Sequence, residues 1–111
     1  MTDFSEYRVR YPKGKYSDKT YYFIGGIHFS NETNDKAAQE LSDMTKLYPS
    51  SDKINDARFL LAVTYERMKD KDRAIKLYRE MAKEVANPYK TKAEARLKEI
   101  SNAIRATFLH N

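Results

Sequence analysis

The sequence repeats itself at a distance of 37 residues. At this shift, Tyr11-Pro12 falls on Tyr48-Pro49, and Asp35-Lys36-Ala37 falls on Asp72-Arg73-Ala74. A period of this length holds two helices and is typical of solenoid proteins, in which each unit leaves an apolar face that its neighbour covers. The chain also has only three Gly and three Pro, which argues against an all-β fold. The repeat therefore predicts an all-α chain of stacked helix pairs.

The most complete unit spans residues 56–80, with the sequence DARFLLAVTYERMKDKDRAIKLYRE. It reads as two helices joined by a polar turn at 69–72. The first helix, expected at about 53–68, is apolar around much of its circumference, which is typical of a helix covered by neighbours on two sides. The second helix has a single inward stripe. This stripe consists of Ala74, Leu77, Tyr78, Met81 and Val85.

Two more helices are expected before this unit, from apolar residues at helical spacing. One runs over about 18–30, with Ser17 or Asp18 as its cap. The next runs over about 35–47, with Asn34 as its N-cap. Its inward stripe consists of Ala37, Leu41, Met44 and Tyr48.

The last helix is expected at about 88–108, with a cap residue and a proline, Asn87-Pro88, at its start. Within it, Glu94-Ala95-Arg96-Leu97 resembles Asp56-Ala57-Arg58-Phe59 at a shift of 38 residues. We expect this helix to cover the end of the stack. Its inward stripe consists of Tyr89, Ala93, Leu97, Ile100, Ile104 and Phe108.

Gly25 and Gly26 lie in the middle of the helix expected at 18–30. Glycine inside a helix costs about 1 kcal/mol relative to alanine. Two such residues are expected only where another backbone approaches the helix closely. The alternative is a β-hairpin through Tyr21 to Phe29, since aromatic residues flank the glycine pair.

The start of the chain matches the end of a unit. Phe4, Tyr7 and Tyr11 suit a short amphipathic turn ended by Pro12. This stretch corresponds to 41–49, so we expect the chain to begin inside a unit, either as an excised segment or as a short protein with a truncated first unit. The expected division of the domain is 1–12, 13–49, 50–86 and 87–111.

These residues resemble the tetratricopeptide repeat family, in which small residues let paired helices approach and large ones fill the seam. The second unit shows the family pattern in Leu61-Ala62, Tyr65, Ala74 and Tyr78. The first unit shows it in Ile24-Gly25, His28, Ala37 and Leu41, with His28 in place of an aromatic residue. The resemblance implies a right-handed solenoid of antiparallel helix pairs, with about two units and a C-terminal capping helix.

The period exceeds the family's usual length of about 34 residues, and Tyr-Pro recurs after the second helix of each pair. In these two respects the chain is similar to repeat proteins of the bacterial cell envelope, namely outer-membrane assembly lipoproteins and periplasmic partners of the Tol-Pal system. This resemblance implies a location in the periplasm or cell envelope. A cytoplasmic location is the alternative.

The composition points away from catalysis. The chain lacks cysteine and has two histidines, so thiolate metal sites are excluded, and we expect His28 to pack between helices rather than bind a metal. No phosphate-binding loop follows from Gly25-Gly26, and no nucleophile with an activating base is apparent. We therefore expect a protein without enzymatic activity, cofactor or metal.

A basic, tyrosine-rich segment at 8–22 supports an alternative function. Its cations are Arg8, Arg10, Lys13, Lys15 and Lys19. Basic groups between aromatic rings are used to bind single-stranded nucleic acid, and the net charge of +5 favours acidic partners. The charge excess is moderate, so we favour tyrosines packed at helix seams and solvated lysines, which makes nucleic acid an unlikely partner.

By the resemblance, the first helices of the units line a concave groove that binds a peptide or a partner domain. Tyr22, Phe29 and Phe59 are expected to receive an apolar or helical segment, and Lys19 and Arg67 an acidic group. The complete set of predicted groove residues is Lys19, Tyr22, Gly26, Phe29, Phe59, Val63, Glu66 and Arg67.

Two other interpretations stay open. Phe23 and Phe59 would instead fill the seam between units. A stack of about two units also leaves its ends poorly covered, so chains would pair as a homo-oligomer through Phe4 and Tyr7 or through the last helix.

Overall fold

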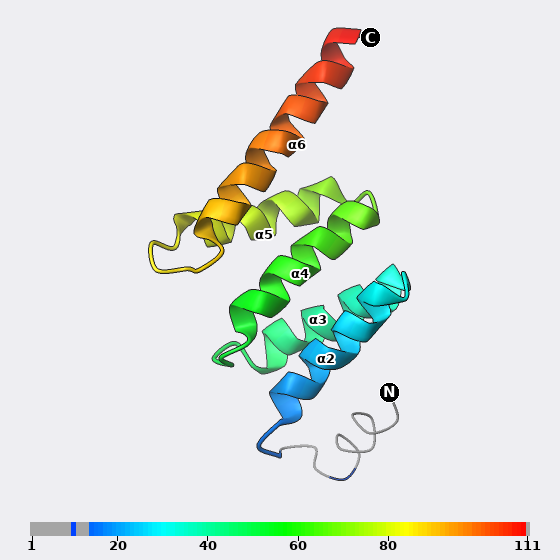
Figure 1. Ribbon diagram of the computed structural model, residues 1–111, viewed down its shortest axis with the longest axis vertical. Helices are drawn as coiled ribbons and strands as arrows, with labels where there is room; N and C mark the ends of the chain where they lie inside the picture. Colours follow the sequence, from blue (N-terminus) through cyan, green and yellow to red (C-terminus); the bar gives the residue numbers. More distant parts are fainter. Residues whose placement is uncertain (1–9, 11–13, 111) are drawn as a thin grey trace.

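The computed structural model describes residue 10 and residues 14–110, and this part of the chain holds five α-helices and no strand. The expected truncated unit at the N-terminus, with Phe4, Tyr7 and Tyr11, lies outside the described residues. The helices are α2 (Ser17–Ser30), α3 (Asn34–Leu47), α4 (Ile54–Arg67), α5 (Lys71–Lys83) and α6 (Lys90–His110) (Figure 1). The predicted all-α class is confirmed for these residues.

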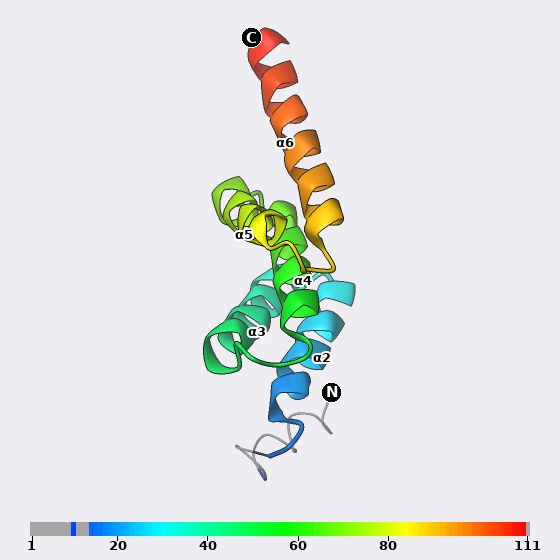
Figure 2. The ribbon, with the colours of Figure 1, turned by 90° about the vertical axis from the view of Figure 1, so that its left-hand side faces the viewer.

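The five helices lie in two layers. Each helix packs against the next one along the chain, and α2 also contacts α4. Figure 2 shows α2, α4 and α6 on one side of the molecule and α3 and α5 on the other. The first helices of the two predicted pairs, α2 and α4, and the predicted capping helix α6 therefore contribute to one shared face, which looks toward the viewer in Figure 1.

The turns between paired helices have the same backbone geometry. Glu32 has a φ of 62° and Lys69 has a φ of 63°, and these left-handed residues are 37 positions apart. The N–H of the residue after each one donates back into the preceding helix: Thr33 bonds the His28 carbonyl at 2.9 Å, and Asp70 bonds that of Tyr65 at 2.9 Å. Local structure thus recurs at the period of the sequence.

The spacing between equivalent residues shortens from 37 to 36 residues before α6. The Ala57 N–H donates to the Lys53 carbonyl at 2.9 Å, and the Ala93 N–H donates to the Tyr89 carbonyl at 2.8 Å, 36 residues further on. The predicted 38-residue match is therefore wrong, since it placed the exposed Ala95 opposite the buried Ala57. The cause is that α5 has 13 residues where α3 has 14.

Two predicted caps of α2 are not formed. The residue before the helix is Tyr16, because a turn bond from the Ser17 N–H to the Gly14 carbonyl already brings Ser17 into helical geometry. The Asp18 carboxylate instead accepts a hydrogen bond of 2.5 Å from the Ser51 hydroxyl. Asp18 therefore links the start of α2 to the loop that leads into α4.

Asn34 is likewise not the cap of its helix, since it is the first residue of α3. Thr33 precedes the helix without capping it, because its hydroxyl donates to the His28 carbonyl at 3.1 Å. At the last helix, Asn87 and Pro88 form a turn before the helix begins. Within this turn, Asn87 Oδ1 accepts a hydrogen bond of 2.8 Å from the Tyr89 N–H. The expected helix start at Pro88 is therefore two residues early.

The core consists of small and large side chains in the seams between helices. One cluster joins α3 and α4, and a second joins α4, α5 and α6. Of the residues predicted to pack at the seams, Ala37, Leu41, Ala62, Ala74 and Tyr78 are fully buried, whereas His28 and Tyr65 are partly buried. Burying each large apolar side chain contributes about 1.5–3 kcal/mol, so the seams account for much of the stability.

Two of the predicted inward stripes are shorter than expected. Val85 is 88% exposed because α5 ends at Lys83 and Val85 lies in the following loop. In α6, Ala93 and Ile100 are buried, but Phe108 is 81% exposed because the helix extends beyond α5. The last helix therefore covers the stack with its first half only.

Gly25 and Gly26 lie in a helix, so the hairpin alternative is wrong. A Cβ added to Gly25 would lie 2.8 Å from Cγ and Cδ2 of Leu41, which is fully buried. The close approach is thus by a side chain, not by a backbone as predicted. A Cβ on Gly26 would meet no atom within 4 Å among the described residues, so the predicted close approach is absent at this second glycine.

The glycine pair provides a matched test of this packing. We expect Gly25→Ala to destabilise the fold by about 1–2 kcal/mol, because overpacking outweighs the gain in helix propensity. Gly26→Ala should stabilise it by about 0.5–1 kcal/mol, because only the propensity changes. Urea unfolding monitored by circular dichroism measures both, and equal effects of the two substitutions would contradict the contact with Leu41.

Candidate functional site

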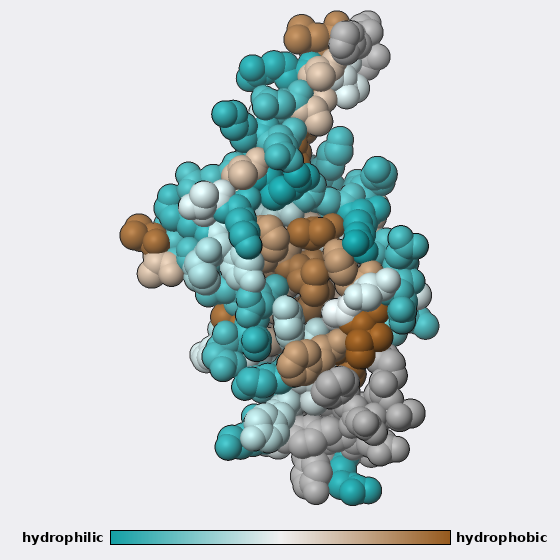
Figure 3. Space-filling view, viewed as in Figure 1, coloured by the Kyte–Doolittle hydropathy of each residue, from teal (hydrophilic) through white to brown (hydrophobic). Residues whose placement is uncertain are grey.

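The face formed by α2, α4 and α6 carries an apolar surface with an open pocket. In Figure 3, hydrophobic residues gather at the centre of this face, over α4 and the adjoining part of α2, with hydrophilic residues around them. A pocket of about 420 Å³ lies along α2. It is lined by Tyr22, Phe23, Gly26, Ile27, Ser30 and Asn31. Two of the predicted groove residues, Tyr22 and Gly26, thus line one hollow.

Tyr22 faces both an aromatic neighbour and a cation. Its ring centroid is 5.7 Å from that of Phe23, and Lys53 Nζ lies 5.8 Å from the Tyr22 centroid. Burial, and then the nearby Asp56 carboxylate, raises the pKa of Tyr22. Phe23 is 40% exposed, so it lines the pocket rather than filling a seam between units.

Asp56 links this edge of the face to the start of α6. Its Oδ1 accepts a hydrogen bond from the Tyr89 hydroxyl. That bond, together with burial, raises the pKa of Tyr89 to about 12. One carboxylate of α4 therefore lies beside Tyr22 of α2 and binds the tyrosine that precedes α6.

The predicted residues Phe29 and Arg67 come together at the other end of the face. The Arg67 guanidinium carbon lies 3.5 Å from the Phe29 ring centroid. Arg67 Nη1 also donates to the Phe29 carbonyl at 2.9 Å. The stacked pair joins the end of α2 to the end of α4 and leaves an exposed cation at the rim of the apolar surface.

Phe59 lies in a seam, in agreement with the competing interpretation of this residue. Its ring stacks on Tyr89 with centroids 4.7 Å apart, and meets Tyr78 edge-on at 5.7 Å. Val63 is half-buried and lies one helical turn from both Phe59 and Arg67 on α4. This row places Val63 between the aromatic seam and the cation at the helix end.

Lys19 is engaged within the chain. Its Nζ lies 3.3 Å from Asp52 Oδ1, and this hydrogen-bonded contact raises the pKa of Lys19. Lys15, also in the basic segment, lies 5.4 Å from the Tyr16 ring centroid. Since Asp52 offsets its charge, Lys19 contributes less to attraction of acidic groups than the sequence suggests.

Glu66 is the most constrained of the predicted groove residues. Its Oε2 accepts a 2.5 Å hydrogen bond from the Tyr78 hydroxyl, and its Oε1 pairs with Arg96 Nη2 at 2.5 Å. Burial alone raises the pKa of Glu66, but the bonds from Arg96 and Tyr78 outweigh it, so the pKa is lowered overall. Glu66 thus joins α4 to α5 and α6.

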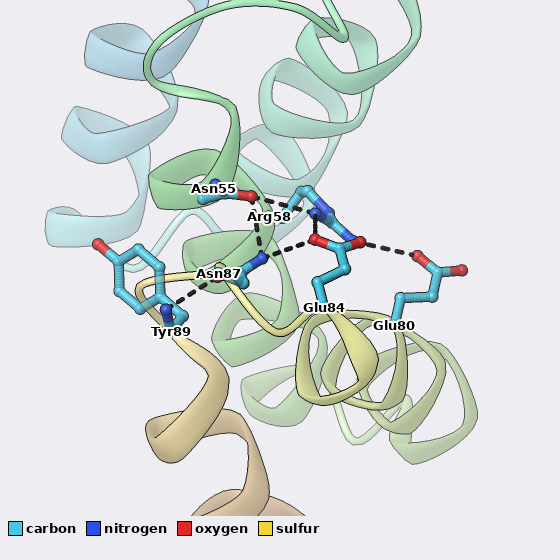
Figure 4. Close-up of polar contacts among 6 residues, drawn as sticks. All are labelled: Asn55, Arg58, Glu80, Glu84, Asn87 and Tyr89. Carbon is cyan, nitrogen blue, oxygen red and sulfur yellow. Dashed lines mark hydrogen bonds and ion pairs between the residues drawn. The ribbon is translucent and has the colours of Figure 1, made fainter.

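A second polar network, which the sequence did not indicate, joins α4 to the loop before α6 (Figure 4). Arg58 forms two parallel bonds of 3.0 Å to Glu84, and its Nη1 also donates to Asn55 Oδ1 at 3.1 Å. The buried Asn87 bonds both Asn55 and Glu84. The bonds from Arg58 and Asn87 lower the pKa of Glu84. These bonds hold the loop against α4. Because the bonded residues are far apart in the sequence, no periodic pattern predicts them.

Metal-binding side chains do not gather in the described part of the chain. Among the described residues, no group of three or more acidic or histidine side chains lies so as to hold a metal ion. His28 Nδ1 lies 3.2 Å from the Thr33 hydroxyl at the end of α2. No helix in the described part of the chain has the length and apolar character needed to cross a membrane. The face formed by α2, α4 and α6 therefore combines apolar side chains at its centre with charged side chains at its edges.

Comparison of the sequence with models of known protein families and with curated proteins found no match.

The Glu66 link provides a stability test. We expect Glu66→Gln to destabilise the fold by about 1–3 kcal/mol, because it leaves the Arg96 guanidinium without a charged partner on α4. The matched control is Glu94→Gln, which breaks only the exposed Lys90–Glu94 pair of α6 and should cost at most about 0.5 kcal/mol. Urea unfolding at neutral pH measures both. Equal costs would show that the link contributes no more than a surface pair.

The Tyr89–Asp56 bond predicts a loss of stability at high pH. Tyr89 has a pKa of about 12 in the folded chain, whereas an unfolded tyrosine titrates near about 10. Its contribution is therefore complete below about pH 10 and is lost as the pH rises through the folded pKa. Tyrosinate absorbance, taken as the difference from a Tyr89→Phe protein, reports this titration. Asp56→Asn should move it toward pH 10, and an unchanged titration would contradict the bond.

Proposed function

We propose that this chain is a non-catalytic interaction scaffold, built as a tetratricopeptide-like solenoid of two helix pairs and the capping helix α6. Three features support this architecture. The turns at Glu32 and Lys69 share one geometry, the family-pattern residues occupy the seams, and helices α2, α4 and α6 share one layer. An arrangement of this kind presents an extended face for a partner.

We further propose that this face binds a peptide segment of a partner protein. The observation that carries the proposal is the apolar surface over α4 and α2, with the open pocket at Tyr22 and Gly26. Lys53 immediately precedes α4 and is paired with Asp56 at 3.9 Å, whereas Arg67, the last residue of α4, is an exposed cation at the rim of the surface. The expected ligand therefore has apolar side chains at its centre and an acidic group toward the end that meets Arg67.

The process that we propose for this binding is assembly of the cell envelope. It rests on the recurring Tyr-Pro and the 37-residue period, in which the chain is similar to envelope repeat proteins. Nucleic-acid binding through 8–22 is not advanced as a second function, because Asp52 offsets the charge of Lys19.

Gly26 allows the pocket to be blocked without disturbing the core. Since a Cβ there meets no described atom within 4 Å, Gly26→Gln should fill the pocket and leave the fold intact. The control is Lys36→Gln, at an exposed position of α3 in the other layer. Random peptides displayed on phage are selected on the wild-type protein, and the selected sequences are synthesised.

We expect the selected peptides to be apolar with an acidic residue toward one end. Fluorescence anisotropy should show that Gly26→Gln weakens their binding about tenfold, as expected for loss of a central pocket, whereas Lys36→Gln changes it less than about twofold. Failure to select any peptide, or equal binding by both variants, would reject peptide recognition on this face.

A further inference from the structure

The apolar stripe of α6 continues after its cover ends. Along this stripe the exposed fraction rises from 0% at Ala93 to 7% at Ile100, 45% at Ile104 and 81% at Phe108. Residues 101–109 are all exposed. They are exposed because the second half of α6 projects beyond α5 (Figure 1). An apolar stripe of this length on a helix surface is typical of a helix that packs against another helix.

An open groove of about 400 Å³ runs between α5 and the middle of α6. Its apolar side chains are Ile75 from α5 and Leu97, Ile100 and Ile104 from α6. Its charged side chains are Arg79 and Lys98. The groove thus has an aliphatic floor and a cationic rim.

The position of the groove in the fold indicates what shape fits it. After α2 and after α4, a turn of three residues leads to a second helix that packs along the first. The backbone pattern before α4 recurs before α6, 36 residues later. No further helix follows α6 within the described residues. The groove lies where α6 would receive its paired helix, so a helix is the shape that it fits.

The charges of α6 indicate the chemistry of that helix. Its acidic residues Glu94 and Glu99 are paired with Lys90 and Arg96, respectively. Lys98, at the groove, has Arg105 seven residues further on, and this spacing places both on one side of the helix. Two copies of α6 packed against each other would bring these cations together, which disfavours a symmetric pair.

We propose that the groove between α5 and α6 binds an acidic amphipathic helix of a partner protein. Leucine-like side chains of that helix cover Ile75, Leu97 and Ile104, and its flanking carboxylates meet Arg79 and Lys98. This is a second surface, separate from the pocket along α2. A chain with both surfaces joins two partners.

The probe is a labelled synthetic peptide of about 18 residues, or five helical turns, with leucines on one face and glutamates beside them. A second peptide carries lysines in place of the glutamates. Fluorescence anisotropy at low ionic strength should show binding of the glutamate peptide and at least about tenfold weaker binding of the lysine peptide. Equal binding of the two would overturn the proposed charge recognition.

Variants of the protein locate the binding. The double change Arg79→Glu with Lys98→Glu should weaken binding of the glutamate peptide about tenfold or more. The matched control, Lys36→Glu with Lys46→Glu on α3, changes net charge equally and should weaken it less than about threefold. Ile104→Ser tests the apolar floor of the groove at a position that is 45% exposed. This change should also weaken binding of the glutamate peptide, and circular dichroism checks that the helix is intact.

Two outcomes would overturn the proposal. In one, the double change at Arg79 and Lys98 and the control double change on α3 weaken binding equally. The peptide would then be attracted by the net charge of the protein and not by the groove. In the other, sedimentation shows a dimer of the wild-type chain that Ile104→Ser dissociates, which would make a second copy the occupant. Gly26→Gln should leave binding of the glutamate peptide unchanged, so failure here is distinguishable from failure on the α2 face.

Discussion

The contact on which the second half of the fold most depends is the bond between Tyr78 and Glu66. The Tyr78 ring is fully buried among α4, α5 and α6, and its hydroxyl would be left without a partner in an apolar seam if Glu66 did not accept it at 2.5 Å. A partly buried carboxylate is stabilised in turn by a cation, and Arg96 of α6 provides it. The Tyr78 hydroxyl thus links α5 to Glu66 of α4, and Arg96 extends this link to α6.

The sequence was sufficient for the parts of the fold that follow from periodic, local patterns. The 37-residue period predicted the helix pairs, and the small residues Ala62 and Ala74 predicted where paired helices approach. The end of α5 was not predictable in this way, because Val85 continues the apolar stripe on a helical wheel although the helix has already ended. Gly26 was misjudged for a related reason, since a glycine that borders a pocket and one that meets a buried leucine look alike in sequence.

The candidate site was predicted in part. Phe29 and Arg67 were expected on one face, and they stack there because their positions, 38 residues apart, lie at the ends of neighbouring helices. The partners of Lys19 and Glu66, which are Asp52 and Arg96, were not expected. Pairs of this kind join elements whose relative rotation only the packed structure determines, and no spacing rule along one helix reveals them.

The projecting half of α6 also has consequences for dynamics. Helical hydrogen bonds in 101–109 are not reinforced by burial, since every residue there is exposed. A short helical segment in water is only marginally stable, so these turns open and reform far more often than the seams do. Amide protection should therefore decline along α6 from Ala93 toward Phe108. A partner helix in the adjoining groove would raise this protection, so that binding and the ordering of the last turns become a single event.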